Sequence, residues 1–234
     1  MPDTQPALIV LTGSIASGKS TVGRLTVLET DLRFIPEDVD SLDADRRVLD
    51  AYYAAVADFA RGAPPGGTGS GSCRTTEDIR AVVLATQAHF IRRRAATLRE
   101  HLAIGGGALV ERHPYDDIEV FSRRNVEQGL LSATDLDQLG RLADSELNRV
   151  PAPRLVVFLH ADPLRLRERI ARRGRPQERD LVRPDNPYLD ELGLLYAGWY
   201  ERCPFPKTRI QADDLDEATI ASRVRDAVRA HRLG

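Results

Sequence analysis

The chain has 234 residues, of which 42% are hydrophobic and 29% charged, as expected for an ordinary globular protein. Its 33 basic and 35 acidic side chains give a net charge of -2, so neither nucleic acid nor an anionic membrane is expected as a main partner. Cys73 and Cys203 match no metal-ligand spacing and are expected as reduced thiols. The start lacks a basic segment before its apolar run, and no stretch reaches the roughly 18 apolar residues of a membrane helix, which predicts a cytoplasmic protein.

The expected secondary structure alternates between short apolar strands and longer helices. The strand candidates are residues 7–12, 32–36, 107–111, 154–160 and 207–211. Helical sequence covers roughly 41–60, 76–104, 115–148 in two pieces, 162–172, 187–202 and 215–232. Ser132 and Asp162 are predicted N-caps, the second with Pro163 at the first helical position. This alternation predicts an α/β fold with a doubly wound, five-stranded parallel sheet flanked by helices.

Directly after the first strand, the sequence GSIASGKST matches the pattern G-x-x-x-x-G-K-S. Its glycines let backbone N–H groups converge on phosphate oxygens, and its lysine reaches the outer phosphates, where it also serves catalysis. The motif therefore predicts a phosphate loop, a P-loop NTPase fold and ATP as ligand, with the hydroxyl of Ser20 on Mg²⁺. The residues expected to contact ATP are Gly13, Ser14, Ala16, Ser17, Gly18, Lys19, Ser20 and Thr21.

Two carboxylates follow strands whose carboxyl ends should border the same crevice. Glu111 ends the third predicted strand, where it can hold hydrated Mg²⁺, and Arg112 beside it can neutralise charge that develops during phosphoryl transfer. Glu37 follows the second strand and can accept the proton of a neutral hydroxyl, which favours an alcohol over a phosphate as acceptor. The plainer alternatives are a solvated strand end for Glu111 and a solvated acidic turn for Glu37, Asp38 and Asp40.

Residues 62–72 (GAPPGGTGSGS) consist almost entirely of Gly, Pro, Ser and Thr, which bury too little apolar surface to hold one conformation. Strands needed to complete the sheet lie after this segment, so it is predicted to be a flexible insertion and not a domain boundary. The whole chain, 1–234, is expected to form a single kinase-type P-loop domain.

One face of the predicted helix 76–104 mixes apolar and polar side chains. The residues that recur on it every three or four positions are Ile79, Val83, Gln87, Phe90 and Arg94. Hydrogen-bonding groups among apolar ones are what a ligand pocket needs, so this face is a candidate acceptor site. The alternative is a partly exposed helix, since the three consecutive arginines 92–94 cannot all face inward.

The segment 165–179 is strongly basic, and Gly174 breaks its helix between two arginines. A basic run is usually a solvated face. A helix end followed by a loop can instead swing guanidinium groups onto a triphosphate, which predicts an Arg-rich lid at 172–179.

With these pieces in place, the sequence resembles the deoxyribonucleoside kinase family from about residue 7 to residue 203. The matching pieces are GSIASGKST, the position of Glu37, VLDAYY, TQAHFIRRR, ERHPYDD, RIARRGRPQE and YLDELGLLYAGWY. The resemblance implies that Glu37 is the general base for a nucleoside 5'-hydroxyl, that Arg112 steadies the reacting oxygens, and that Glu111 serves Mg²⁺ with Ser20.

The resemblance also assigns residues that bind the two substrates. Tyr53 and Glu178 align with positions that bind the sugar 3'-hydroxyl, and Gln87, Arg94 and Asp117 align with positions that read the base. The lid arginines would be Arg169, Arg173 and Arg175, and members of the family are commonly homodimers.

The chain departs from the family pattern on the acceptor side. The order Pro36-Glu37 reverses the usual Glu-Pro, His113 follows Arg112 where the family usually has Ser, and the approach to Gln87 lacks the usual aromatic segment. The expected activity is transfer of the ATP γ-phosphate to the 5'-hydroxyl of a (deoxy)nucleoside. The alternatives are a thymidylate-like nucleoside monophosphate kinase, a kinase of another small alcohol or modified nucleoside, and a non-catalytic ATP-binding regulator.

Overall fold

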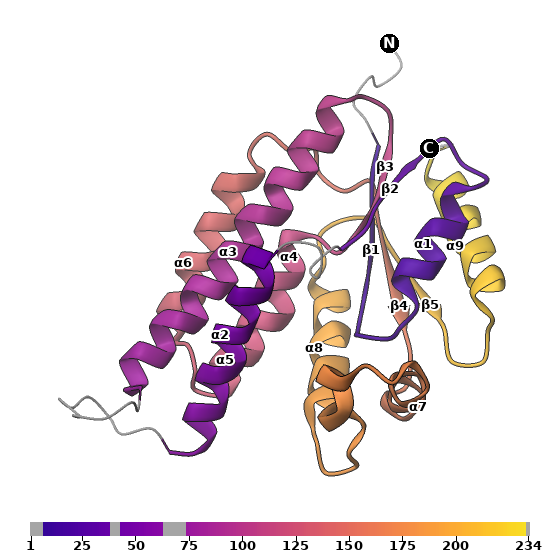
Figure 1. The fold of residues 1–234 in the computed structure, drawn as a ribbon. Helices are drawn as coiled ribbons and strands as arrows, with labels where there is room; N and C mark the ends of the chain where they lie inside the picture. The colour runs from indigo at the N-terminus through magenta and orange to yellow at the C-terminus, as the bar shows by residue number, and fades with distance from the viewer. Residues whose placement is uncertain (1–6, 38–42, 63–73, 233–234) are drawn as a thin grey trace.

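The computed structural model describes residues 7–37, 43–62 and 74–232, which are built around a five-stranded sheet (Figure 1). The strands are β1 (Leu8–Gly13), β2 (Arg33–Ile35), β3 (Ala108–Glu111), β4 (Leu155–His160) and β5 (Lys207–Gln211). Their order is β2-β3-β1-β4-β5, and all four neighbouring pairs are parallel. The five predicted strands and their parallel pairing are confirmed.

The helices follow the expected alternation, with one departure. They are α1 (Lys19–Val27), α2 (Asp43–Ala60), α3 (Thr76–Ala103), α4 (Pro114–Asp116), α5 (Arg123–Glu127), α6 (Ala133–Leu147), α7 (Pro163–Arg173), α8 (Tyr188–Arg202) and α9 (Glu217–Arg232), with a π-helix η1 (Asp117–Ser122) and a 3₁₀-helix η2 (Pro176–Val182). The departure is in 115–148, where a wide π turn separates α4 from α5. Apolar spacing does not reveal such a turn, because η1 is little more than one turn long.

Both predicted helix N-caps are confirmed. The side chain of Ser132 accepts a hydrogen bond from the backbone of Asp135 at 3.2 Å and completes a capping box at the start of α6. The carboxylate of Asp162 accepts from the backbone of Leu164 at 2.8 Å, so α7 begins where the Asp-Pro sequence indicates.

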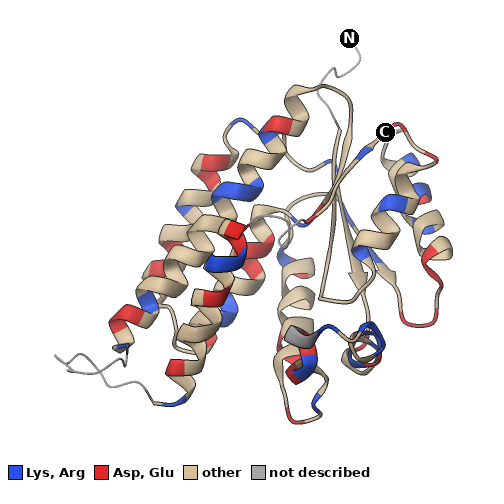
Figure 2. Cartoon of the chain, in the orientation of Figure 1, with Lys and Arg blue, Asp and Glu red and all other residues tan. Residues whose placement is uncertain are grey.

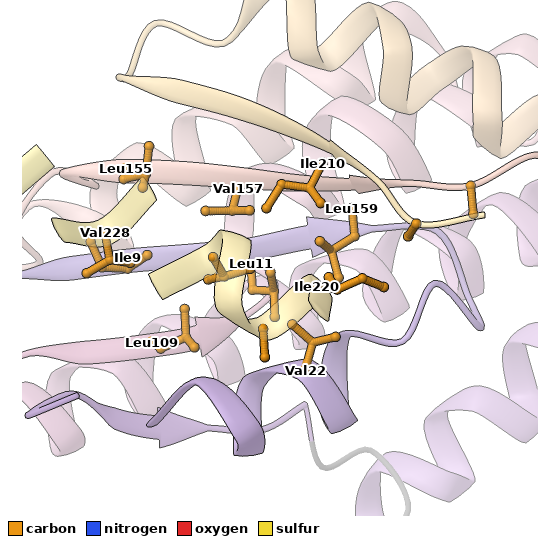
Figure 3. Close-up of a cluster of buried hydrophobic side chains, with 14 of the residues drawn as sticks. Ile9, Leu11, Val22, Leu109, Leu155, Val157, Leu159, Ile210, Ile220 and Val228 are labelled. Carbon is orange, nitrogen blue, oxygen red and sulfur yellow. The ribbon is translucent and has the colours of Figure 1, made fainter. Parts of the chain in front are cut away.

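The two faces of the sheet carry separate buried clusters, because successive strand residues point to opposite sides. On one face, side chains such as Ile9, Leu11 and Val157 pack against α1, α7 and α9 (Figure 3). On the other face, Val10 and Phe158 pack with residues of α3 and α8. Helices therefore cover both faces, which confirms the doubly wound architecture.

A third buried cluster joins α2, α3 and α6 beside the sheet (Figure 1). Of these helices, α3 also packs on the sheet face through Ala95, Leu98 and Leu102, and its Arg94 reaches Glu37 just beyond β2. The parallel order places the ends of β1, β2 and β3 next to one another, where a crevice for ligands is expected.

Some predicted features fall outside the described residues. These are residues 63–72 of the predicted insertion, Cys73, and Asp38 and Asp40 of the alternative acidic turn. Cys203 is a buried free thiol. Within residues 7–37, 43–62 and 74–232, no helix is long and apolar enough to cross a bilayer.

Candidate active site

The turn between β1 and α1 requires glycine at two positions. Gly13 has a φ of +142°, and a Cβ there would stand 2.3 Å from the carbonyl oxygen of Leu159 on β4. Gly18, with a φ of +94°, precedes the first helical residue, and no side chain caps the N-terminus of α1. The first N–H groups of α1 thus remain available to an anion, as the motif predicts for a phosphate loop.

Lys19 lies folded against the loop that carries it. Its ammonium group donates to the carbonyl oxygens of Gly13 at 3.0 Å and Ser14 at 2.8 Å, and its side chain is almost completely buried. Burial and the nearby positive charge of Arg112 lower the pKa of Lys19 to about 8. A phosphate ligand at the loop would supply the negative charge that this buried cation lacks.

Ser20 and Glu111 meet across the crevice. The Ser20 hydroxyl donates to Oε1 of Glu111 at 2.9 Å, and the Glu111 carboxylate also accepts from the backbone of Glu37 at 3.4 Å. One hydroxyl and one buried carboxylate fit Mg²⁺, which keeps several waters and takes further ligands from substrate phosphates. The residues that the structure describes contain no group of three or more His, Cys, Asp or Glu suited to a protein-only metal cage.

Glu37 lies between two guanidinium groups. Its Oε2 is 2.7 Å from Nε of Arg112, and its Oε1 is 2.6 Å from Nη2 of Arg94. Burial opposes ionisation, but the two arginines outweigh it and lower the pKa of Glu37 to about 2. The carboxylate is 16% exposed, so it is a charged group built into the crevice and not part of a solvated turn.

Arg112 has an unusual backbone conformation. Its φ is +66°, in the left-handed region that residues other than glycine rarely adopt. Its guanidinium carbon lies 4.7 Å from the ring centre of Phe121, and its side chain is 9% exposed. Backbone strain of this kind costs roughly 1–3 kcal/mol and is concentrated at functional sites.

The predicted base-reading residues lie together on α3 and η1. Arg94 Nε is 2.9 Å from Oδ2 of Asp117, and Gln87, two turns earlier on the same face of α3, accepts from the Ser122 hydroxyl at 3.4 Å. Gln87 is 6% exposed, whereas the Arg92 side chain is 60% exposed, so this face of α3 is turned inward. Burial raises the pKa of Asp117 to about 6, although Arg94 opposes that rise.

The predicted lid, 172–179, runs from the last turn of α7 into η2, and α7 itself is rich in basic residues (Figure 2). Arg169 donates to the carbonyl oxygen of Ala16 in the phosphate loop at 3.5 Å and to Asp213 at 3.3 Å. Arg173 Nε donates to Oε2 of Glu178 at 3.0 Å. Arg175 reaches the other oxygen of the same carboxylate at 3.7 Å. Arg169 is thus placed at the phosphate loop, and Arg173 and Arg175 are placed on Glu178.

The two residues expected at the sugar are placed differently. Glu178 is 7% exposed and held by the lid arginines, whereas Tyr53 is 61% exposed on the outer side of α2. Its neighbour Tyr52 turns inward instead, and its hydroxyl donates to Asn125 at 2.9 Å. Burial raises the pKa of Tyr52 to about 12.

Sequence reasoning assigned no role to four polar residues around this site, the buried Thr12, His113 and Asp116 and the half-buried Tyr52. Two of them carried a usable signal. Thr12 is a polar residue at the end of an otherwise apolar strand, and Asp116 is a second acid directly before Asp117. The inward turn of Tyr52 had no such signal, because it stands beside another tyrosine.

Comparisons with known proteins bear on the family and the fold. A family model described as deoxynucleoside kinase matches residues 76–231. The deoxyadenosine/deoxycytidine kinase of Bacillus subtilis (strain 168) is 24% identical over 225 residues, which span 93% of this chain and 90% of the relative. The solved deoxyadenosine kinase from M. mycoides with bound dCTP superposes with a TM-score of 0.68 at 17% identity, over 95% of this chain and 99% of that one. The same enzyme with bound dATP gives a TM-score of 0.67 at 17% identity, over the same shares of both chains.

The family model covers about two thirds of the chain, and the five-stranded parallel fold described above matches the solved deoxyadenosine kinases. The reading as a non-catalytic ATP-binding regulator is therefore set aside. The chain belongs to the deoxynucleoside kinase family and is an ATP-dependent nucleoside kinase.

Proposed function

We propose that this enzyme transfers the γ-phosphoryl group of ATP to the 5'-hydroxyl of a 2'-deoxynucleoside, with Glu37 as the general base. The observation that carries the proposal is the position of Glu37, an ionised carboxylate beside the phosphate loop, held by Arg112 and Arg94. A carboxylate at this point repels an acceptor that is already a phosphate, but it can receive a hydrogen bond from an alcohol.

In the proposed step, the 5'-oxygen forms a bond to the γ-phosphorus while the bond from that phosphorus to the leaving oxygen of ADP breaks. The hydroxyl proton passes to the Glu37 carboxylate. A base with a pKa of about 2 suffices, because phosphoryl transfer proceeds through a loose transition state and the proton leaves late. Glu37 therefore acts mainly by orienting the hydroxyl, while Arg112 and Lys19 offset the negative charge of the phosphates.

Ser20 and Glu111 would hold Mg²⁺, which supplies positive charge to the donor phosphates when bound. Arg169, Arg173 and Arg175 would close over the same phosphates as an Arg-rich lid, and Glu178 would bind the sugar hydroxyl. Tyr53, the second residue expected at the sugar, is exposed, so Tyr52, which turns inward beside it, is the better candidate for that contact. A homodimeric assembly, implied by the family resemblance, belongs to the same proposal and is tested by light scattering.

The Gln87 amide can pair with any base edge that carries a donor beside an acceptor, and the choice proposed here is adenine or cytosine. Both present an exocyclic amino group beside a ring nitrogen acceptor, and a glutamine amide pairs with such an edge through its oxygen and its nitrogen. The curated relative is named for deoxyadenosine and deoxycytidine, which supports the same choice. Asp117 and Arg94 would complete the polar rim around the base.

The test is an assay of purified protein with Mg-ATP and the four natural deoxynucleosides, their ribonucleoside counterparts and the corresponding monophosphates. We expect ADP and a nucleoside 5'-monophosphate in equal amounts, with deoxyadenosine or deoxycytidine turned over fastest. The variant Glu37→Gln should lose about 10²–10⁴-fold in kcat. Glu29→Gln is the matched control, because the Glu29 side chain is 62% exposed and forms a surface ion pair with Arg225 at 3.2 Å.

The same assay separates the rival activities. Transfer to a nucleoside monophosphate that survives Glu37→Gln would favour the thymidylate-like kinase, since a phosphate acceptor arrives already ionised. Turnover of another small alcohol but of no natural nucleoside would favour the specialised alcohol kinase. No product from any acceptor, despite tight ATP binding, would overturn the proposal.

A further inference from the structure

Thr12 and Asp116 form a buried hydrogen bond that the proposed chemistry does not use. The Thr12 hydroxyl donates to Oδ1 of Asp116, although 104 positions separate the two residues in the chain. Thr12 is 0% exposed and Asp116 is 1% exposed. Thr12 is the last residue before Gly13 and the phosphate loop, whereas Asp116 lies four residues after Arg112.

Together with the backbone, this bond closes a ring around Arg112. The Arg112 N–H donates to the carbonyl oxygen of Leu11 on β1 at 3.0 Å. The following N–H, from His113, donates to Oδ2 of Asp116 at 2.9 Å. The Asp116 carboxylate is in turn bonded to Thr12, which lies on β1 like Leu11. Both peptide groups that flank the left-handed Arg112 are thus anchored to the strand that leads into the phosphate loop.

We infer that Asp116, together with Thr12, is a positioning residue that sets Arg112 relative to the phosphate loop. The inference rests on the proposed function, since Arg112 is there the group beside the transferred phosphate. The ring couples the donor side of the site, at the end of β1, to the acceptor side, where Arg112 holds Glu37 at 2.7 Å. A rotation of the peptide after Arg112 would move that guanidinium away from Glu37.

A plainer role for Asp116 is to cap α4, where it accepts from the backbone of His113. That role explains one oxygen of the carboxylate. It does not explain the other oxygen, which accepts a hydrogen bond from Thr12 on β1. Capping alone also has no need of the strained φ of +66° at Arg112, which the surrounding bonds must hold in place.

The test compares Thr12→Val, which keeps the side-chain shape but removes the donor, with Thr12→Ser, which restores the hydroxyl. Thr86→Val is the matched control, because Thr86 is also buried and donates at 2.9 Å, but to Val82 within α3. For Thr12→Val we expect kcat to fall about a hundredfold while the KM values for ATP and nucleoside change by less than about threefold. Thr12→Ser should recover most of the rate, and Thr86→Val should stay within about twofold of the wild type.

A second readout does not depend on activity. In a crystal structure of Thr12→Val, and of Asp116→Asn as a second variant, the φ of Arg112 should leave the left-handed region or its contact with Glu37 should lengthen. Unchanged Arg112 geometry, or equal loss of kcat in Thr12→Val and Thr86→Val, would overturn the inference. A wild type without nucleoside kinase activity would instead overturn the proposed function. The crystal structures of the variants would then still test whether Thr12 and Asp116 hold Arg112 in place.

Discussion

Glu37 and Arg112 lie opposite each other just beyond neighbouring strands, with Oε2 and Nε 2.7 Å apart. The parallel register of β2 and β3 pairs Ile35 with Val110, and Glu37 and Arg112 each lie two residues further on, just past the strand ends. The sheet therefore brings the two segments side by side, and the ion pair joins them directly beyond it. Sites built on sheet ends in this way hold their geometry closely.

Arg94 bridges two carboxylates, and its removal should destabilise the fold. Its contacts with Glu37 and Asp117 are 2.6 Å and 2.9 Å, with the Asp117 side chain only 3% exposed. We expect Arg94→Gln to lower the free energy of unfolding by about 3–5 kcal/mol at pH 7.5, because it leaves buried charge unpaired. Urea titration measures this, and Arg94→Gln with Asp117→Asn should recover part of the loss. Arg92→Gln, on the exposed side of α3, is the control, and a double variant no more stable than the single one would contradict the explanation.

Binding of ATP should take up a proton through Lys19. Its pKa is lowered to about 8 by burial and by Arg112, and triphosphate binding should raise it again. At pH 8.5, where ATP itself is fully ionised, we expect uptake of roughly three quarters of a proton per ATP bound. Calorimetry in buffers of different ionisation enthalpy measures this uptake. Lys19→Arg should bind without it, since arginine does not titrate there, and equal uptake by both proteins would exclude Lys19 as the source.

Gln87 should determine the kcat/KM for the nucleoside and leave the KM for ATP unchanged. Replacing it by Leu keeps much of the volume but leaves the base edge unpaired, so kcat/KM for the preferred nucleoside should fall about 10²-fold or more. The KM for ATP should change by less than about twofold. Gln138→Leu, an exposed position on α6, is the control in the same steady-state assay. A Gln87→Leu enzyme that loses only ATP affinity would place Gln87 outside the acceptor site.

The proposed lid predicts different effects on kcat for two adjacent arginines at the end of α7. Arg172 and Arg173 are both exposed, but Arg173 contacts Glu178 at 3.0 Å. We expect Arg173→Ala to lower kcat by about a hundredfold or more, because it removes positive charge from the transferred phosphate, and Arg172→Ala to stay within about twofold. Single-turnover kinetics with saturating ATP measures the difference. Equal effects of the two substitutions would contradict the lid and indicate that the segment is only a basic surface.

His113 should make the fold sensitive to mild acid. Burial, and next the charge of Arg94, lower its pKa from 6.5 to about 3, so the folded protein holds the neutral imidazole. The unfolded chain therefore binds more protons below pH 6.5, and stability present above that pH is lost as the pH falls toward 3. Between pH 7.5 and pH 5 this amounts to about 2 kcal/mol.

The pH dependence of the free energy of unfolding, from urea titrations at the two pH values, checks this expectation. His113→Asn keeps a residue that can cap α4 but should remove most of the difference. His101→Asn, at the half-buried end of α3, should retain it. An unchanged pH dependence in His113→Asn would assign the acid sensitivity to another group.

The local sequence by itself determined the strands, the N-caps and the phosphate loop. Buried parallel strands such as β1 are continuous apolar runs, and the turn after β1 needs glycine wherever a Cβ would collide or φ is positive. These properties depend on neighbours a few positions away, so a linear pattern reveals them. Strand ends and helical spacing also brought Glu37, Gln87 and Arg94 to attention, and the resemblance then suggested their roles. The structure joins Glu37 to Arg94 and turns Gln87 inward on the same helix as Arg94.

Only the tertiary structure decided how these groups meet. The pairing of Glu37 with two arginines depends on the register of β2 and β3 and on the rotation of α3. The inward turn of Tyr52 in place of Tyr53 depends on how α2 packs against α5. The bond from Thr12 to Asp116 joins residues 104 positions apart, and no local spacing encodes such a contact because the pairing of β1 with β3 is what brings the end of β1 beside α4.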